Sequence, residues 1–284
     1  MKDIAIAVYI DNDINIITEF GWLYKSWMFS GSWRTSDIVA FHNPAISYDD
    51  LPRDNSITYI PLAPYTERST GWEGYPYINS IEYLTMPEAS VLMKYKHVLR
   101  TDCDCFLTPY FPGLKPRLTR FGAGMFASDT DVVIRLAEIS KRWSIPYIYN
   151  NIGSTFISDS GNVLHYSQIQ MEYCRKLKAD EFKDGQGTWP GWYYGVLTMY
   201  AGQLAASSVF GYNMIMGGLD AHCMASDPMS PQDYHIHAWH TYQYFSKHSW
   251  RAGEYKNYDM DTLDKNIIND YCLWIAGPGP EVVK

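Results

Sequence analysis

The sequence is poor in charged residues and contains no cluster of basic ones. Only 19% of its 284 residues are charged, and the formal net charge is -8. Proteins that follow a phosphate backbone use clustered Lys and Arg, so no nucleic-acid partner is expected. Hydrophobic residues make up 46% of the chain, which provides enough apolar material for a folded core and gives no compositional sign of disorder.

The sequence also lacks a long apolar run. The N-terminal run Ile4–Ile10 is too short for a signal sequence or a transmembrane segment.

Cysteine is scarce and odd in number, with five residues, and Cys103 and Cys105 alternate with acids in a way that no disulfide framework requires. We therefore expect reduced thiols and a cytoplasmic protein without a transmembrane segment.

No internal repeat or low-complexity tract is present, and the length suits one α/β domain. Continuous β-branched runs predict buried parallel strands, and apolar residues at helical spacing predict the helices between them. This alternation predicts an α/β fold with a mostly parallel central sheet flanked by helices. The expected strands are 4–10, 38–41, 57–60, 98–100 and 151–157; the expected helices are 16–29, 81–93, 131–143, 168–182 and 195–207; the tail from residue 235 is expected to be irregular.

Aromatic residues are abundant, with 24 Tyr and 10 Trp. Many lie in loop-like stretches such as 71–77 and 189–194. Flat apolar rings with polar edges suit sugar ligands, but they suit ordinary cores equally well. The aromatic content alone therefore does not decide the function.

Asp-x-Asp occurs four times, so context must decide which pair carries chemistry. Two of the pairs have structural explanations: Asp129/Asp131 stands where a helix begins, and Asp259/Asp261 lies in a polar loop. The four pairs are Asp11/Asp13, Asp102/Asp104, Asp129/Asp131 and Asp259/Asp261.

Asp11 follows the first expected strand, and ligands of open α/β sheets bind beyond the carboxyl ends of strands. Asp11 and the neighbouring Tyr9 are therefore candidates to contact a nucleotide. Tyr9 is expected to reach the base or ribose.

Asp102 and Asp104 interrupt the strand-like segment 95–107, whose apolar flanks should bury them at a strand end. In an extended chain, residues i and i+2 face the same side about 6.5 Å apart, so both carboxylates can approach one hard cation. Such an ion offsets the cost of burying two acids. The alternative is a solvated turn.

Segment 98–107, Val-Leu-Arg-Thr-Asp-Cys-Asp-Cys-Phe-Leu, resembles the DxD segment of GT-A glycosyltransferases. Together with Trp189-Pro190-Gly191-Trp192-Tyr193, the overall pattern is similar to that of uncharacterised glycosyltransferase-like proteins of algae and large viruses. The resemblance implies a single GT-A-like domain over residues 1–284. Residues 1–110 would form a Rossmann-like half that binds a nucleotide sugar, and residues 111–284 an acceptor-binding half with a C-terminal lid.

The resemblance also implies roles for individual residues. Asp102 and Asp104 would hold Mn²⁺ or Mg²⁺ against the diphosphate of a nucleotide sugar, with a UDP-sugar expected as donor. Asn151-Ile152-Gly153 is similar to a strand of several retaining families in which the Asn faces donor or acceptor. The later His-x-His-x-x-His and Lys resemble residues that complete the metal site and touch the diphosphate. The assignments are Asp102, Asp104, His237 and His240 to the metal; Tyr9, Asp11, Arg100, Asp102 and Lys247 to the donor; and Asn151, Asp220 and Asp227 to catalysis.

Imidazole is a reasonable ligand beside carboxylates for a borderline metal such as manganese, and His235, His237 and His240 are the candidates, with His240 expected as the third ligand and His237 as its substitute. Residues 235–255 are expected to become ordered as a lid when the donor binds.

An inverting transfer needs a carboxylate base near the acceptor hydroxyl, for which Asp220, Asp227 and Glu172 are candidates. A retaining transfer does not need that base, and the stereochemistry stays open.

Three other classes of function compete with a glycosyltransferase that acts on a glycan or another hydroxyl acceptor. A non-catalytic carbohydrate-binding protein explains the aromatic residues but not a buried acidic pair. A metal-dependent nucleotidyltransferase uses similar acids, yet it usually has a Gly-rich phosphate loop, whereas Asp and Asn follow Ile10 here. A two-carboxylate glycoside hydrolase is the third alternative.

Overall fold

The computed structural model describes residues 2–69, 71–127, 129–223, 225–239 and 245–277. A seven-stranded sheet with the order β3-β2-β1-β4-β7-β6-β8 forms the centre of a mixed α/β fold. Its pairings are mostly parallel, as expected, but β7 runs antiparallel to both β4 and β6. The strands are β1 Ile4–Ile10, β2 Ser36–His42, β3 Ile57–Pro61, β4 His97–Arg100, β6 Thr119–Ala123, β7 Ile152–Asp159 and β8 Met214–Met216.

A second, three-stranded sheet has the order β5-β10-β9. It consists of β5 (Cys105–Leu107), β10 (His235–His237) and β9 (Ala221–His222). The antiparallel pairing of β10 with β5 places His237 opposite Cys105. The small sheet therefore brings the late His-x-His segment to the chain that leaves β4.

Both faces of β1 are buried, which explains its continuous apolar sequence. Ala5, Ala7 and Tyr9 face one apolar cluster, which includes residues of α5 and α6. The alternate residues Ile4 to Ile10 face a second cluster with α1. Strand alternation thus distributes one run of residues between two cores.

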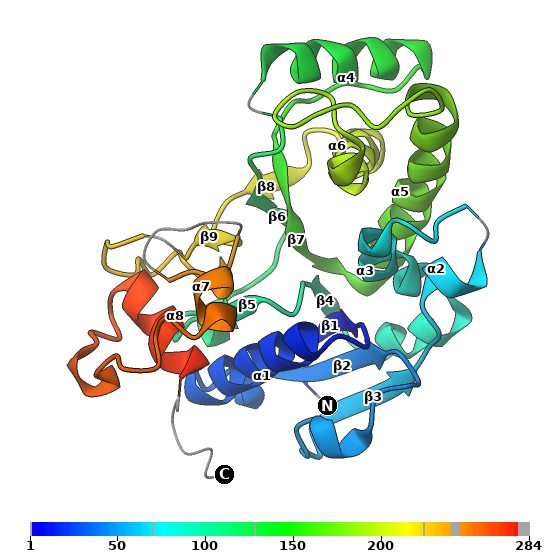
Figure 1. Ribbon diagram of the computed structural model, residues 1–284. Helices are drawn as coiled ribbons and strands as arrows, with labels where there is room; N and C mark the ends of the chain where they lie inside the picture. Colours follow the sequence, from blue (N-terminus) through cyan, green and yellow to red (C-terminus); the bar gives the residue numbers. More distant parts are fainter. Residues whose placement is uncertain (1, 70, 128, 224, 240–244, 278–284) are drawn as a thin grey trace.

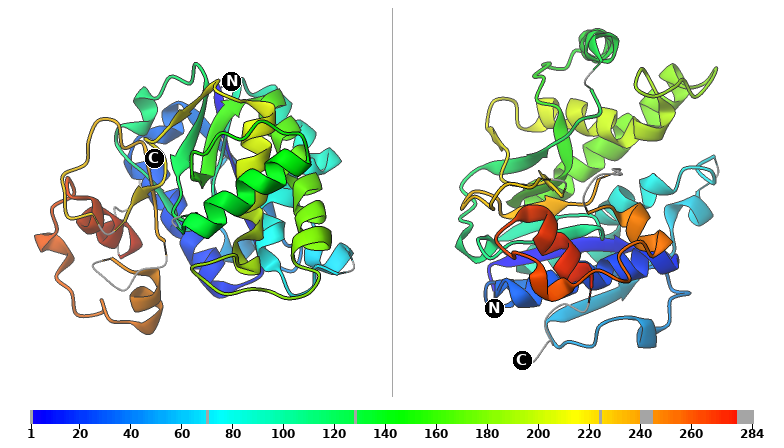
Figure 2. Two further views of the ribbon diagram at one scale, coloured as in Figure 1. Left: turned by 90° about the horizontal axis from the view of Figure 1, so that it is seen from above. Right: turned by 60° about the vertical axis from the view of Figure 1, so that its left-hand side comes forward.

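Helices flank the large sheet. Figure 1 shows α7 and α8 beside β5, β9 and α1, whereas α4, α5 and α6 lie around β6 and β7; the two views of Figure 2 show the same separation. The helices are α1 Ile14–Phe29, α2 Tyr65–Arg68, α3 Asn79–Glu82, α4 Thr130–Arg142, α5 Ser160–Glu181, α6 Leu197–Val209, α7 Lys247–Ala252 and α8 Ile268–Ala276. Within the described ranges, no helix is long and apolar enough to cross a membrane.

Two expectations about secondary structure were wrong, and one strand was not predicted. The helix expected over 81–93 is a series of short turns, α3, Tyr83–Thr85 and Pro87–Lys94, because Pro87 cannot continue a helix from the preceding turn. The tail is not irregular, since it forms β10, α7 and α8. Strand β6, with the sequence Thr-Arg-Phe-Gly-Ala, has too few apolar residues for its pattern to predict it.

The structural explanations of two Asp-x-Asp pairs are confirmed. Asp129 caps α4 and accepts a hydrogen bond from the backbone N–H of Asp131. Asp259 accepts one from the backbone N–H of Asp261 at the start of a short 3-10 helix. Asp129 and Asp259 therefore stabilise the N-termini of helical segments.

Candidate functional site

Residues 101–104 connect β4 of the large sheet to β5 of the small one, with a bend at residues 103 and 104. The expectation that Asp102 and Asp104 lie side by side on an extended strand was therefore wrong. The side chain of Asp104 is buried, at 10% exposure, and that of Asp102 is 25% exposed. The bend gives the two carboxylates different partners.

Asp104 is paired with two cationic side chains from the C-terminal part of the chain. The ammonium of Lys247, 143 residues later, donates a hydrogen bond to Oδ2 of Asp104. Nε2 of His237 lies 3.4 Å from Oδ1. Burial alone would raise the pKa of Asp104, but Lys247 and His237 outweigh it and hold the pKa well below the usual range. Asp104 is thus a carboxylate at neutral pH.

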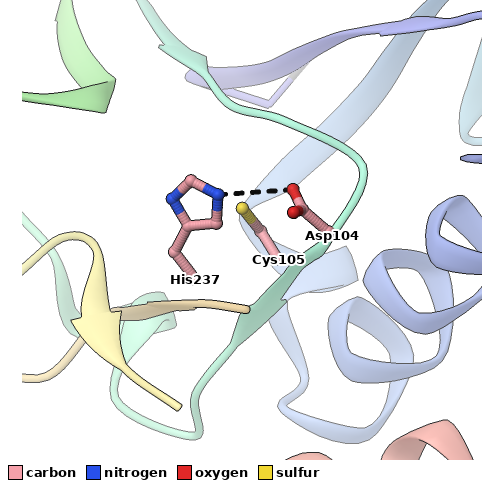
Figure 3. Close-up of side chains that lie close together, drawn as sticks. All are labelled: Asp104, Cys105 and His237. Carbon is pink, nitrogen blue, oxygen red and sulfur yellow. Dashed lines mark ion pairs between the residues drawn. The ribbon is translucent and has the colours of Figure 1, made fainter. Parts of the chain in front are cut away.

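His237 lies between two carboxylates. Its Nε2 faces Asp104, and its Nδ1 lies 3.3 Å from Oδ1 of Asp220. Burial lowers the pKa of the ring, but the two acids together raise it to about 10. Figure 3 shows one ring nitrogen turned toward Asp104 and the other on the far side of the ring.

Asp220 has no exposed side-chain surface and sits directly against the backbone of two strands. Its Oδ2 accepts a hydrogen bond of 3.1 Å from the backbone N–H of Thr155. A Cβ placed on Gly122 of β6 or Gly153 of β7 would come within 2.2 or 2.1 Å of that oxygen. A base must reach an acceptor hydroxyl, and this enclosed carboxylate does not have the access that the sequence-based assignment needs.

His235 occupies the interior next to Asp220 and uses both ring nitrogens locally. Its Nδ1 accepts the backbone N–H of Asp220 at 3.2 Å, and its Nε2 lies 2.8 Å from Oγ1 of Thr101. Burial lowers its pKa to about 4, so the ring is neutral. Because Nδ1 accepts, Nε2 carries the proton and donates to Thr101.

Asp102 is held by Arg100, whose Nη2 donates to Oδ1 at 2.8 Å. The guanidinium is fully buried and also donates to the carbonyls of Ser80 and Ser154 at 2.7 and 2.6 Å. Arg100 therefore connects α3, β4 and β7 and orients Asp102. Its donors are already used by the protein, which does not favour the direct contact with the donor that the sequence suggested.

Glu19 of α1 extends the charged cluster beyond Lys247. It is almost fully buried and accepts a hydrogen bond from Arg251 of α7. Burial, with the nearby charge of Asp104, raises its pKa to about 7. Arg251 and Lys247, one turn apart on α7, are thus each paired with an acid of another element.

Within the described ranges, two groups of three acidic, cysteine or histidine side chains have potential metal-ligand atoms within 4.8 Å of one another: Asp104, Cys105 and His237, and Cys105, Asp220 and His235. Carboxylate and imidazole in the first group suit a borderline divalent cation such as Mn²⁺. Burial raises the pKa of the Cys105 thiol well above its usual range, so Cys105 is a poor ligand for such an ion. Nδ1 of His237 is buried and makes no hydrogen bond within the described residues.

The other residues assigned to a donor have protein partners. Tyr9 is packed in the core against Tyr83, and its hydroxyl donates to the carbonyl of Leu62 at 3.0 Å. Asp11 accepts hydrogen bonds from the side-chain amide of Asn79, at 3.2 and 3.3 Å. A contact of Tyr9 or Asp11 with a nucleotide stays a prediction.

The remaining catalytic candidates lie in different surroundings. Asn151 adopts a left-handed backbone conformation, and its side chain accepts the backbone N–H of Ala127 at 3.4 Å, so it supports a turn. Asp227 is exposed in the chain between β9 and β10, and Glu172 is exposed on α5. His240 lies outside the described residues. None of the contacts described here links Asn151, Asp227 or Glu172 to the Asp104 cluster.

Sequence reasoning missed Glu19 and Gly122, and it considered Gly153 only as part of the Asn-x-Gly resemblance. Glu19 sits in a helix among apolar residues, and an acid on the buried face of a helix is a signal that can be read. The two glycines are ordinary in sequence, because only the fold shows which side chain occupies the space above them.

The fold and the cluster together define an α/β protein with a buried acid, histidine and lysine centre at the carboxyl end of a central parallel strand. The chain belongs to a family described as a domain of unknown function, DUF7164, whose model matches residues 1–273. No curated protein matches the sequence.

Proposed function

We propose that this protein is a metal-dependent glycosyltransferase of the GT-A type that transfers a sugar from a nucleotide-diphosphate sugar, with a UDP-sugar as donor, to a glycan or another hydroxyl acceptor. The observation that carries the proposal is the convergence of His237 and Lys247 on Asp104, at the point where the chain leaves β4. Ligands of open α/β sheets bind beyond the carboxyl ends of parallel strands, and β4 is parallel to β1 at that end.

Asp104 and His237 would hold the cation, and Asp102, which is ion-paired with Arg100, would supply the second acid. Bound there, Mn²⁺ or Mg²⁺ would neutralise charge that grows on the departing diphosphate. Asp104 is already ionised and buried, as a ligand for a hard or borderline cation requires.

Lys247 would bind the diphosphate. Its ammonium now neutralises Asp104. A divalent cation bound to Asp104 would replace that charge, so Lys247 would be free to contact a phosphate oxygen. The pair therefore keeps the site neutral before the donor arrives and supplies a cation to the donor afterwards.

Exposed aromatic rings support a sugar acceptor. Tyr77 and Trp189 are about half exposed, and the loops that carry them are joined by Tyr75, whose ring lies 4.8 Å from that of Tyr194. The Tyr77 loop leads directly into α3, where Ser80 binds Arg100. Exposed rings of this kind offer stacking surfaces for a glycan.

A cytoplasmic location belongs to the same proposal. All five cysteines are buried as free thiols, which suits a reducing compartment.

Calorimetric titration with UDP, with and without Mn²⁺, tests the proposal. The wild-type protein should bind UDP in a metal-dependent manner, and Asp102→Asn or Asp104→Asn should weaken binding by about 100-fold or more, because each removes a charge that the cation needs. Asp129→Asn and Asp131→Asn are matched controls from a pair with a structural role, and both should bind normally.

Hydrolysis and transfer assays across UDP- and GDP-sugars identify the donor. Metal-dependent nucleotide binding with release of pyrophosphate instead of a sugar would favour a nucleotidyltransferase. Sugar binding without nucleotide binding would favour a non-catalytic carbohydrate-binding protein. Unchanged UDP affinity in both Asp102→Asn and Asp104→Asn would reject the assignment of the site.

A further inference from the structure

Asp220 is the most enclosed acid of the cluster, with no exposed side-chain surface. Its backbone φ is 56°, a left-handed conformation that non-glycine residues rarely adopt. The missing side chains of Gly122 and Gly153 leave space in which Oδ2 lies against β6 and β7. A left-handed backbone and two glycines at one position indicate that the location of this carboxylate matters.

Oδ1 of Asp220 is buried and has no hydrogen bond within the described part of the chain. Two imidazoles approach it: Nδ1 of His235 at 3.5 Å and Nδ1 of His237 at 3.3 Å. His235 cannot donate from Nδ1, because that nitrogen already accepts the backbone N–H of Asp220. His237 is therefore the available donor.

We propose that Asp220 is a positioning residue that accepts a hydrogen bond from Nδ1–H of His237 and so directs Nε2 of His237 toward Asp104, where a divalent cation would bind Nε2 as that nitrogen releases its proton to solvent. The proposal rests on the proposed metal site, but it does not depend on the reaction that the site supports. Nδ1 of His237 and Oδ1 of Asp220 are 3.3 Å apart but lack good hydrogen-bond geometry. A small rotation of the imidazole would form the hydrogen bond.

The geometry of the ring matches this role. Nε2 of His237 already faces the Asp104 carboxylate, while Nδ1 points to the opposite side (Figure 3). A carboxylate behind a ligating histidine fixes its tautomer and orientation and makes the other nitrogen a better ligand. Asp220 would thus act through His237 and would not touch the substrate.

A double-mutant cycle with Mn²⁺ alone tests the inference. The variants are Asp220→Asn, His237→Ala and the combination, each titrated with Mn²⁺ by calorimetry in the absence of nucleotide. Asp220→Asn should weaken Mn²⁺ binding by about 10–100-fold in the wild-type background. It should have no further effect when His237 is already Ala, because Asp220 has then lost the residue through which it acts. Asp131→Asn, which changes an exposed acid in the first turn of α4, is the matched control and should bind Mn²⁺ normally.

Gly153→Ala provides a second route if Asp220→Asn fails to fold. The added methyl group would displace the Asp220 carboxylate while keeping its charge, so Mn²⁺ affinity should again fall. Pulsed electron spin resonance of bound Mn²⁺ gives a readout that general loss of stability does not change: coupling to a histidine nitrogen should be present in the wild type and weakened in Asp220→Asn.

Three results would overturn the inference. The first is no Mn²⁺ binding by the wild type, and the second is normal Mn²⁺ affinity in Asp220→Asn. The third is that Asp220→Asn lowers Mn²⁺ affinity equally with His237 present and with His237 replaced by Ala. Failure of the proposed function is distinguishable from these. If the double-mutant cycle shows the expected coupling of Asp220 and His237 in Mn²⁺ binding, but the protein neither binds UDP nor transfers a sugar, the glycosyltransferase proposal is rejected. The positioning role of Asp220 would still stand.

Discussion

The same three-residue pattern, Asp-x-Asp, stands in two very different regions of this molecule. At the start of α4, Asp129 caps the helix and Asp131 lies in its exposed first turn. At the end of β4, Asp104 is buried against Lys247 and His237, and Asp102 is held by Arg100. The difference shows that surroundings rather than spacing give an acidic pair its chemistry.

The two regions differ chiefly in solvent access. At α4, water and backbone N–H groups satisfy the carboxylates, so each charge costs little. At β4, the chain has placed cations from α7 and β10 around Asp104, because an unpaired buried carboxylate would be very unfavourable. Burying charges from three distant segments lowers stability, and clusters of this kind are concentrated at functional sites.

The largest expected effect that separates the two regions is the loss of stability in Asp104→Asn. This substitution leaves Lys247 and His237 charged and buried without their shared acid. We expect the free energy of unfolding in the absence of metal to fall by about 3–5 kcal/mol, the usual cost of breaking a buried pair. Urea unfolding followed by circular dichroism measures it.

Asp129→Asn is the matched control for that measurement. Asn caps a helix about as well as Asp, so the stability should change by only a few tenths of a kcal/mol. If both variants lost equal stability, the contrast between the buried and the exposed pair would be invalid.

Lys247→Met should produce a smaller loss of stability, and it should also increase the affinity for Mn²⁺. Asp104 would keep His237 as a partner, so we expect a loss of about 1.5–3 kcal/mol without metal. Mn²⁺ should bind on the order of 10-fold more tightly, because the ammonium no longer competes for Asp104. UDP should bind more weakly in the presence of Mn²⁺.

Thermal unfolding with and without Mn²⁺, together with calorimetry, checks the prediction for Lys247. Recovery of the melting temperature on addition of Mn²⁺ is the expected outcome. A variant that Mn²⁺ does not stabilise would indicate that Lys247 and the cation do not share Asp104.

The sequence predicted the first part of the fold well, since β1 to β4 and α1 have continuous apolar runs or clear helical spacing. It also singled out Asp104, His237 and Lys247, three residues of the observed cluster. The bend at residues 103 and 104, which separates the partners of the two acids, was not visible, because the alternation of residues 95–107 resembles one strand.

The roles of Asp220 and Arg100 could not be derived from sequence for a different reason. Each depends on contacts between segments far apart: Asp220 on Gly122 and Gly153, and Arg100 on Ser80 and Ser154. From residue type alone, Asp220 suggests a catalytic base and Arg100 a phosphate contact. Their burial and their hydrogen bonds within the protein instead favour roles in positioning neighbouring side chains.

At the exposed pair, the expected effects are modest. Asp129→Ala removes the side chain that caps α4, and we expect it to lower stability by about 1 kcal/mol, within the usual range for a lost N-cap. Mn²⁺ affinity should not change. Chemical denaturation and calorimetry on the same protein sample measure both quantities, and a metal-binding defect in Asp129→Ala would contradict the structural role of this pair.

The smallest effect is expected at Glu181, which connects α4 to the end of α5 by accepting hydrogen bonds from Arg135 and Arg142. Burial would raise the pKa of Glu181, but the two arginines lower it below the usual value. Its contribution to stability is therefore present above about pH 4.3, the ordinary pKa of Glu, and is lost as the pH falls through the lower pKa of the folded state.

Both arginines are about half exposed, so water and salt screen these ion pairs. We expect Glu181→Gln to cost about 0.5 kcal/mol at neutral pH and low salt, and less at 1 M salt. The loss in Asp104→Asn should vary much less with salt, because that pair is buried. Urea unfolding of both variants at low and high salt compares the two regions directly. Equal salt dependence would mean that solvent reaches Asp104 as freely as it reaches the surface of α4, and the contrast between the two regions would fail.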